Sequence, residues 1–204
     1  MAHPLSPAPE GMFREIPVIN GELRLADSFY SVSEAGMLLQ KLRDEVFWQQ
    51  ESIRIFGKSY AVPRLIAWVG DEGKAYRYSG ISHDPLPWTA TLSAIRQKIE
   101  AATGTHFNTV LINWYRNGND SMGWHADDEP ELGSNPVIAS LSLGETRMFR
   151  FRQTDNHRNS FGFPVENGSL LLMAGALQHH WQHCIPKSAK PMGDRINLTF
   201  RAIV

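Results

Sequence analysis

The chain has little cysteine and no long apolar run. Its only cysteine, Cys184, has no second cysteine with which to form an internal disulfide, and this fits a reducing compartment. No apolar run approaches the roughly 18 residues that a membrane-spanning helix needs. No charged-then-apolar leader is visible either. We therefore expect an intracellular protein that makes no use of a membrane.

The chain also lacks an excess of charge of either sign. It has 20 Lys and Arg against 21 Asp and Glu, a net charge of −1, so any polyanionic partner would have to meet a local basic patch. A hydrophobic content of 42% is typical of a globular protein, and 204 residues suffice for one domain with a sizeable core. We predict a single domain over 1–204 in which residues 1–12, with three prolines, form a flexible lead-in.

The periodicity of apolar residues predicts two helices followed by many strands. Ser31 and Glu34 have the spacing of a capping box before a helix over roughly 32–46. Pro87-Trp88 opens a second helix, which Gly104 ends. The segments that then read as strands are 107–115, 137–143, 146–152, 169–173 and 196–202. This order predicts an α+β, mainly β protein whose strands form a sandwich or barrel.

The tripeptide His125-Ala-Asp127 is the first candidate for chemistry. Alternate side chains of an extended strand point to one face, so the imidazole and the carboxylate would converge. Two imidazoles and one carboxylate on one face suit Fe(II) and leave its other positions open. The tripeptide alone is weak evidence, because it arises often by chance. Segment 178–183 offers three histidines as the missing ligand, and spacing does not choose among them.

The last predicted strand alternates without a break. Its polar face consists of Arg195, Asn197, Thr199 and Arg201. One interpretation is an antiparallel strand with one wet face. The other is a cationic interior face for a dianionic small molecule, because arginine captures carboxylates with two hydrogen bonds. Asn113 and Tyr115 repeat the same spacing on the strand that leads to His125 and would add neutral donors.

Two stretches are locally basic. Between Arg54 and Tyr78, five basic residues against two acidic ones give +3, with tyrosines and Trp68 interleaved. Such a surface can hold phosphates and stack bases. A solvated strand pair explains the composition about as well. A second local charge of +3 lies near the expected loop over 153–166, where one acidic residue, Asp155, stands against Arg147, Arg150, Arg152 and Arg158. This charge fits either phosphate contacts or a solvated hairpin.

Over roughly residues 50–203 the sequence resembles the AlkB family of Fe(II)/2-oxoglutarate-dependent dioxygenases. The matching segments, in order, are 55–58 (IFGK), 62–64 (VPR), 76–80 (YRYSG), 110–115 (VLINWY), 125–129 (HADDE), 138–142 (IASLS), 181–183 (WQH) and 195–201 (RINLTFR). The resemblance implies a double-stranded β-helix (jelly-roll) core over about 105–204. It also implies N-terminal helices packed outside and a nucleotide-recognition lid over about 50–80.

The resemblance also implies roles for individual residues. His125, Asp127 and His183 would hold Fe(II), with His183 chosen by its place in Trp-Gln-His. The implied 2-oxoglutarate ligands are Asn113, Tyr115, Arg195, Asn197, Thr199 and Arg201. Arg195 would pair with the remote carboxylate, whereas Arg201 would lie near the metal and brace Asp127. The implied substrate-binding residues are Phe56, Gly57, Lys58, Arg64, Tyr76, Tyr78, Ser79, Asp128 and Glu129.

The function implied by the resemblance is oxidative demethylation of alkylated bases. With Fe(II), 2-oxoglutarate and O2, such an enzyme hydroxylates the N-alkyl group of 1-methyladenine or 3-methylcytosine in DNA, or in RNA, and an aldehyde leaves. Alternatives are the same iron chemistry on tRNA, a nucleotide or a protein, and a non-catalytic cupin-like binding module. We expect a monomer, cytoplasmic and associated with the nucleoid in a bacterium, or nuclear in a eukaryote.

Phe56 is the residue that the resemblance assigns to a wedge in the duplex. Phe56→Ala should therefore reduce repair of methylated double-stranded DNA more than repair of the same single strand, because only a duplex needs its stack filled after a base leaves it. Initial rates on the two matched oligonucleotides test this. Equal losses on both substrates would remove the wedge assignment.

Overall fold

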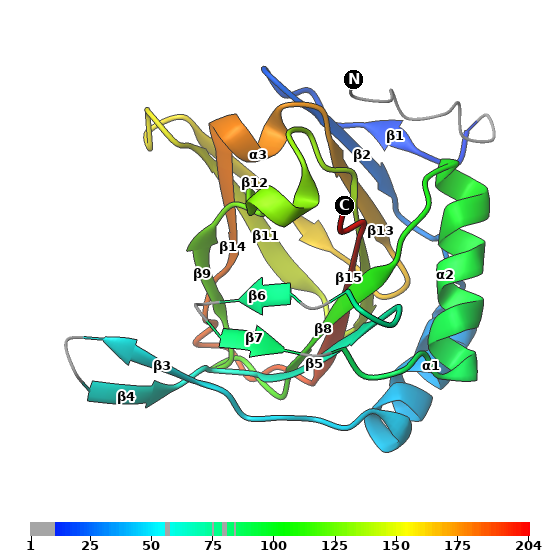
Figure 1. Cartoon of the computed structure of the whole chain (residues 1–204). Helices are drawn as coiled ribbons and strands as arrows, with labels where there is room; N and C mark the ends of the chain where they lie inside the picture. Colours follow the sequence, from blue (N-terminus) through cyan, green and yellow to red (C-terminus); the bar gives the residue numbers. More distant parts are fainter. Residues whose placement is uncertain (1–10, 56–57, 75, 79–80, 84) are drawn as a thin grey trace.

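Two antiparallel sheets that face each other form the body of the protein (Figure 1). The computed structural model describes residues 11–204 apart from 56–57, 75, 79–80 and 84. The larger sheet has the order β1 (Arg14–Glu15), β2 (Glu22–Ala26), β13 (Leu170–Ala174), β10 (Ile138–Gly144), β15 (Arg195–Arg201), β8 (Thr109–Tyr115) and β5 (Leu65–Gly70). The smaller sheet has the order β12 (Ser160–Val165), β11 (Arg147–Gln153), β14 (Trp181–Ile185) and β9 (Met122–His125). Neighbouring strands that are far apart in the sequence make this a jelly roll, which confirms the predicted fold class.

Two long helices, α1 (Val32–Glu45) and α2 (Ala90–Thr103), pack on the outer face of the larger sheet (Figure 1). Ile196, Leu198 and Phe200 of β15 join Ile95 and Ile99 of α2 in one buried apolar cluster. The alternate residues of β15 face the space between the two sheets. Of the two interpretations of this strand, the one with a wet face is wrong, because every residue of β15 is buried and the strand lies inside the larger sheet. None of the described helices is long and apolar enough to span a membrane.

The ends of both helices follow from local hydrogen bonds. Ser31 Oγ accepts a hydrogen bond from Glu34 N at 3.3 Å, and the Glu34 carboxylate accepts one from Ser31 N at 2.9 Å, so the predicted capping box is confirmed. Gly104 ends α2 with a left-handed φ of +66°. This helix starts later than predicted because Thr89 is its N-cap.

Two short hairpins lie outside the two main sheets. The first joins β3 (Ser52–Ile55) to β4 (Lys58–Ala61), and the second joins β6 (Tyr76–Tyr78) to β7 (Ile81–His83). The predicted lid over about 50–80 therefore also contains β5, a strand of the larger sheet. The predicted contacts Phe56, Gly57 and Ser79 lie outside the described residues, as do the side chains of Lys58, Tyr76 and Tyr78.

Three expectations from the sequence need correction. Segment 153–166 is not only a loop, because β12 pairs with β11 along six residue pairs. Arg64 was expected at the substrate surface, but it is 3% exposed and its Nε donates to Asn113 Oδ1 at 2.6 Å. Arg147 was expected at a phosphate-binding or solvated surface and is 2% exposed. Both guanidinium groups can be buried because nearby amide and carbonyl oxygens accept their hydrogen bonds.

The capping box at the start of α1 makes a stability prediction. Ser31→Ala removes the acceptor for Glu34 N and should lower the free energy of unfolding by about 1 kcal/mol. Urea denaturation followed by circular dichroism measures this loss. Ser33→Ala, an exposed position in the first turn of the same helix, is the matched control and should change the value by less than about 0.5 kcal/mol. Equal losses in the two variants would contradict the role of the cap.

Candidate metal centre

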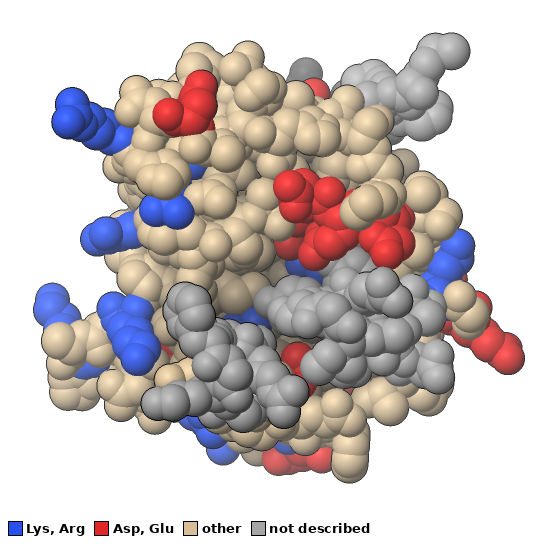
Figure 2. All heavy atoms as spheres, turned by 60° about the vertical axis from the view of Figure 1, so that its left-hand side comes forward, with Lys and Arg blue, Asp and Glu red and all other residues tan. Residues whose placement is uncertain are grey.

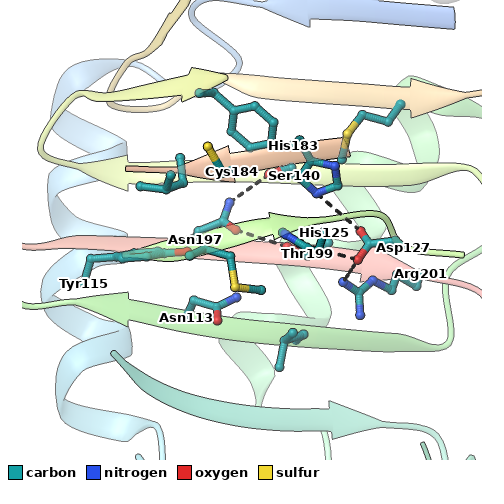
Figure 3. Close-up of a pocket in the computed structure, with 15 residues that line it drawn as sticks. Asn113, Tyr115, His125, Asp127, Ser140, His183, Cys184, Asn197, Thr199 and Arg201 are labelled. Atoms are coloured by element: carbon teal, nitrogen blue, oxygen red, sulfur yellow. Dashed lines mark hydrogen bonds and ion pairs between the residues drawn. The ribbon is translucent and has the colours of Figure 1, made fainter. Parts of the chain in front are cut away.

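Three potential metal ligands meet between the two sheets (Figure 3). His125 is the last residue of β9 and lies directly opposite His183 of β14 in the strand register, so the imidazoles share one face. Asp127 follows β9 and reaches the same point. Its Oδ1 is 3.9 Å from His125 Nε2, and its Oδ2 is 4.0 Å from His183 Nε2. One ligand atom of each residue lies within 4.8 Å of the others.

The carboxylate of Asp127 is buried and held on one side only. Its Oδ1 accepts a hydrogen bond from Arg201 Nη2 at 2.7 Å. Its Oδ2 is buried and has no hydrogen-bond partner among the described residues. Burial alone would raise the pKa of Asp127, but Arg201 and the two histidines outweigh it and leave the pKa below its usual value. The group therefore presents an anionic oxygen toward the two imidazoles.

The two histidines are prepared as ligands in different ways. Burial, followed by repulsion from His125, lowers the pKa of His183 to about 3, so its imidazole is uncharged at neutral pH. The Nδ1 atom of His125 lies 2.9 Å from Gly123 O, which orients the ring and leaves Nε2 toward the centre. Two imidazole nitrogens and one carboxylate oxygen are the donor set that suits Fe(II), so the residues present fit this metal.

Most of the predicted 2-oxoglutarate ligands line the same cavity as this metal centre (Figure 3). They are Asn113, Tyr115, Asn197, Thr199 and Arg201. They come from the neighbouring strands β8 and β15, where Asn113 pairs with Asn197 in the register. Asn197 Nδ2 donates to Ser140 Oγ at 2.8 Å, and Thr199 Oγ1 donates to Asn197 Oδ1 at 3.1 Å. These hydrogen bonds fix the polar floor of the cavity.

Arg195, the sixth predicted ligand, is not among the residues that line the cavity but packs against Tyr115, which is. It is 1% exposed, and its guanidinium carbon is 5.2 Å from the centre of the Tyr115 ring. Its Nη2 donates to Ser142 Oγ at 3.0 Å, whereas Nε and Nη1 have no partner among the described residues. Burial lowers the pKa of Arg195 to about 10, so the group stays charged at neutral pH. A buried cation with two unsatisfied donors fits a carboxylate.

Gln178 is a residue of the site that sequence reasoning missed. It lies in the short helix α3 (Leu177–His180) and is 2% exposed. Its Oε1 accepts a hydrogen bond from Asp127 N at 3.0 Å, so it holds the backbone of the aspartate while Arg201 holds the carboxylate. In the sequence the neighbouring histidines are the obvious candidates for metal ligands. His179 and His180 are exposed, however, and only His183 joins the centre. Burial, which spacing does not reveal, was the missing signal.

The two acidic residues predicted to contact the substrate come directly after Asp127 in the sequence. Asp128 is exposed, and Glu129 is half-buried with an Oε2 atom that has no partner among the described residues. Figure 2 shows the face that carries β9, where acidic side chains gather beside a hollow and basic side chains lie along the opposite edge. On this face of the molecule, therefore, the acidic side chains gather in one region and most of the basic ones lie apart from it.

Comparison with known protein families agrees with this geometry. A family model described as the 2OG-Fe(II) oxygenase superfamily matches residues 22–201, which is nearly the whole chain. The fold and the donor set agree with the place that this match gives the chain in the 2OG-Fe(II) oxygenase superfamily. Membership of this class implies Fe(II), 2-oxoglutarate and O2 as cofactor and co-substrates.

Individual relatives narrow the family. Alpha-ketoglutarate-dependent dioxygenase alkB homolog 3 from Bos taurus is 42% identical over 188 residues, covering 88% of this chain and 65% of the relative. DNA oxidative demethylase ALKBH2 from Homo sapiens is 39% identical over 185 residues, covering 86% and 71%. The chain thus spans slightly less than two thirds of the alkB homolog 3 proteins it matches. It belongs to the AlkB family of the 2OG-Fe(II) oxygenase superfamily.

A solved structure supports the fold. The structure of OsALKBH1 is 17% identical, has a TM-score of 0.60 and covers 93% of this chain and 100% of its own. At this identity the likeness concerns the arrangement of the strands alone. It agrees with the two facing sheets described above.

The hydrogen bond from Asp127 N to Gln178 makes a prediction about metal affinity. Gln178→Met keeps the size of the side chain but removes the acceptor, so the segment carrying Asp127 should loosen and the Kd for Mn(II) should rise about tenfold. Calorimetric titration of the metal-free protein measures this Kd. Gln182→Met is the matched control, because that amide binds Arg152 instead. An unchanged Kd in Gln178→Met would refute the positioning role.

Proposed function

We propose that this protein is an Fe(II)/2-oxoglutarate-dependent dioxygenase that removes N-alkyl groups from nucleic-acid bases, with DNA as its main substrate. The observation that carries the proposal is the buried Asp127 carboxylate, whose Oδ1 accepts from Arg201 and lies 3.9 Å from His125 Nε2, and whose Oδ2 lies 4.0 Å from His183 Nε2. The names of the relatives, a dioxygenase and a DNA oxidative demethylase, support the reaction and the substrate.

In this proposal His125, Asp127 and His183 hold the iron. Bound together with 2-oxoglutarate and O2, the iron supplies the oxidising chemistry that hydroxylates the alkyl carbon. The protein contributes geometry and charge. Arg201 keeps the carboxylate ionised, and burial keeps His183 neutral, so both groups are ready as ligands without a proton being displaced.

The polar strands β8 and β15 provide the 2-oxoglutarate site. Arg195 supplies the positive charge for the remote carboxylate: its guanidinium lies beside the Tyr115 ring that lines the cavity, and its Nε and Nη1 are donors without a partner among the described residues. Asn113, Thr199 and Arg201 line the same cavity as the three residues that would hold the iron. Because these side chains are buried, water is excluded from the co-substrate and each charge-assisted hydrogen bond is stronger than it would be in solvent.

We propose cationic lesions, 1-methyladenine and 3-methylcytosine, as the substrates. Asp128 and Glu129 place negative charge next to the iron ligands, which favours a base made positive by alkylation. These lesions also weaken base pairing, so the base can be flipped out at lower cost. The contacts assigned to Phe56, Gly57, Lys58, Tyr76, Tyr78 and Ser79 remain predictions from the sequence. The protein would act where the nucleic acid is, at the nucleoid or in the nucleus.

Turnover on 3-methylcytosine in single-stranded DNA, duplex DNA and RNA, measured side by side, tests this proposal. We expect equal amounts of succinate and formaldehyde with unmodified cytosine as the product. Asp127→Ala should reduce all three to background, because the iron loses its only carboxylate ligand. Asp155→Ala, in the exposed loop before β12, is the control and should turn over normally.

Two results would contradict different parts of the proposal. Undiminished succinate formation by Asp127→Ala would exclude the metal centre described here. Succinate formed without loss of the base methyl group would retain the dioxygenase and exclude these bases as its substrate.

A further inference from the structure

Arg147 is a buried cation that the proposed reaction does not use. It opens β11 and is 2% exposed. Its Nη2 donates to Asp120 O at 2.9 Å and to Pro186 O at 2.7 Å, and its Nη1 donates to Asn117 O at 3.3 Å. One guanidinium thus ties the loop between β8 and β9 to the residue that follows β14.

Arg147 reaches the co-substrate site through Tyr115. Its guanidinium carbon lies 5.6 Å from the centre of the Tyr115 ring, and that of Arg195 lies 5.2 Å from the same centre. Tyr115 lines the cavity, whereas neither guanidinium does. Any influence of Arg147 on a bound molecule must therefore act through Tyr115 and through the electric field that it adds behind that ring.

Among the described residues around Tyr115, Arg195 has no ion-pair partner, whereas the carboxylates of Asp120 and Glu145 lie near enough to Arg147 to favour its charged form. Arg201 is neutralised by Asp127, and the carboxylate of Asp120 is taken by Arg116 at 2.7 and 3.0 Å. The hydrogen bonds of Arg147 all end on backbone carbonyls, which carry no full charge. Repulsion from Arg147 adds to burial in lowering the pKa of Arg195. Two buried guanidiniums thus share one aromatic ring, an arrangement that an anion entering the cavity would relieve.

We propose that Arg147 is a positioning residue for the remote carboxylate of 2-oxoglutarate: it fixes Tyr115 and strengthens the positive field at Arg195. The inference rests on the proposed function and adds a residue that the cavity lining does not contain. Because Arg147 lies on the side of Arg195 and not of the iron ligands, its effect should depend on the remote carboxylate and not on the keto-acid end.

Two ligands distinguish an effect on the remote carboxylate from an effect on the keto-acid end. N-oxalylglycine has both carboxylates and is not turned over, whereas 2-oxobutyrate lacks the remote carboxylate. Both are titrated calorimetrically into the full chain loaded with Mn(II). Arg147→Met should raise the Kd of N-oxalylglycine about tenfold and that of 2-oxobutyrate less than about twofold. Arg147→Lys, which keeps the charge, should recover most of the affinity for N-oxalylglycine.

Arg150→Met is the matched control, because Arg150 lies on the same strand with an exposed side chain and should leave both Kd values unchanged. Equal losses for the two ligands, equal losses in the Lys and Met variants, or no loss at all would overturn the inference. So would failure of both Arg147→Met and Arg147→Gln to fold, since the role would then be structural. If the unaltered protein does not bind N-oxalylglycine, the proposed function itself fails.

Discussion

The buried ion pair between Arg201 and Asp127 is the interaction on which the rest of the site depends. Withdrawing two charges from water is costly, and their attraction offsets this cost only in good geometry. Here Arg201 is 2% and Asp127 2% exposed, and the contact is 2.7 Å. The pair occupies one carboxylate oxygen and leaves the other unsatisfied, a state that is unfavourable in an apolar interior without a cation. A metal ion bound at this point would satisfy that oxygen.

Strand β15 makes this arrangement possible because its two faces have different tasks. Ile196, Leu198 and Phe200 anchor it under the helices, in the cluster that stabilises the fold. The residues between them carry the polar groups of the cavity. Since β8 and β10 flank it on both sides, the backbone of β15 cannot shift without breaking two ladders. The packing of the hydrophobic core therefore fixes the positions of the polar side chains at the cavity.

The sequence predicted the parts of the molecule that have a local period. The capping box at Ser31, the alternation of β15 and the ordered motifs were sufficient for the fold class and for the residues gathered at the cavity. The sequence did not predict the environment of polar side chains that are buried by contacts distant in the chain. Arg64 and Arg147 read as surface cations because charge is visible in a sequence, whereas backbone carbonyls that converge on a guanidinium are not. The role of Gln178 could not be predicted, because its hydrogen-bond partner is a backbone amide 51 positions away.

The proposed ligands also belong to different layers of the sandwich. His125 and His183 are neighbours across the smaller sheet, whereas Asp127 is held by Arg201 of the larger one. The gap between the layers therefore sets the spacing of the ligands, and metal sites tolerate only a few tenths of an ångström. The ring of Phe149 is stacked on the His183 ring, with 5.3 Å between the ring centres, and belongs to the buried side chains that set the distance between the sheets. In evolution such an aromatic position would be constrained as catalytic residues are, although its ring has no atom that could bind iron.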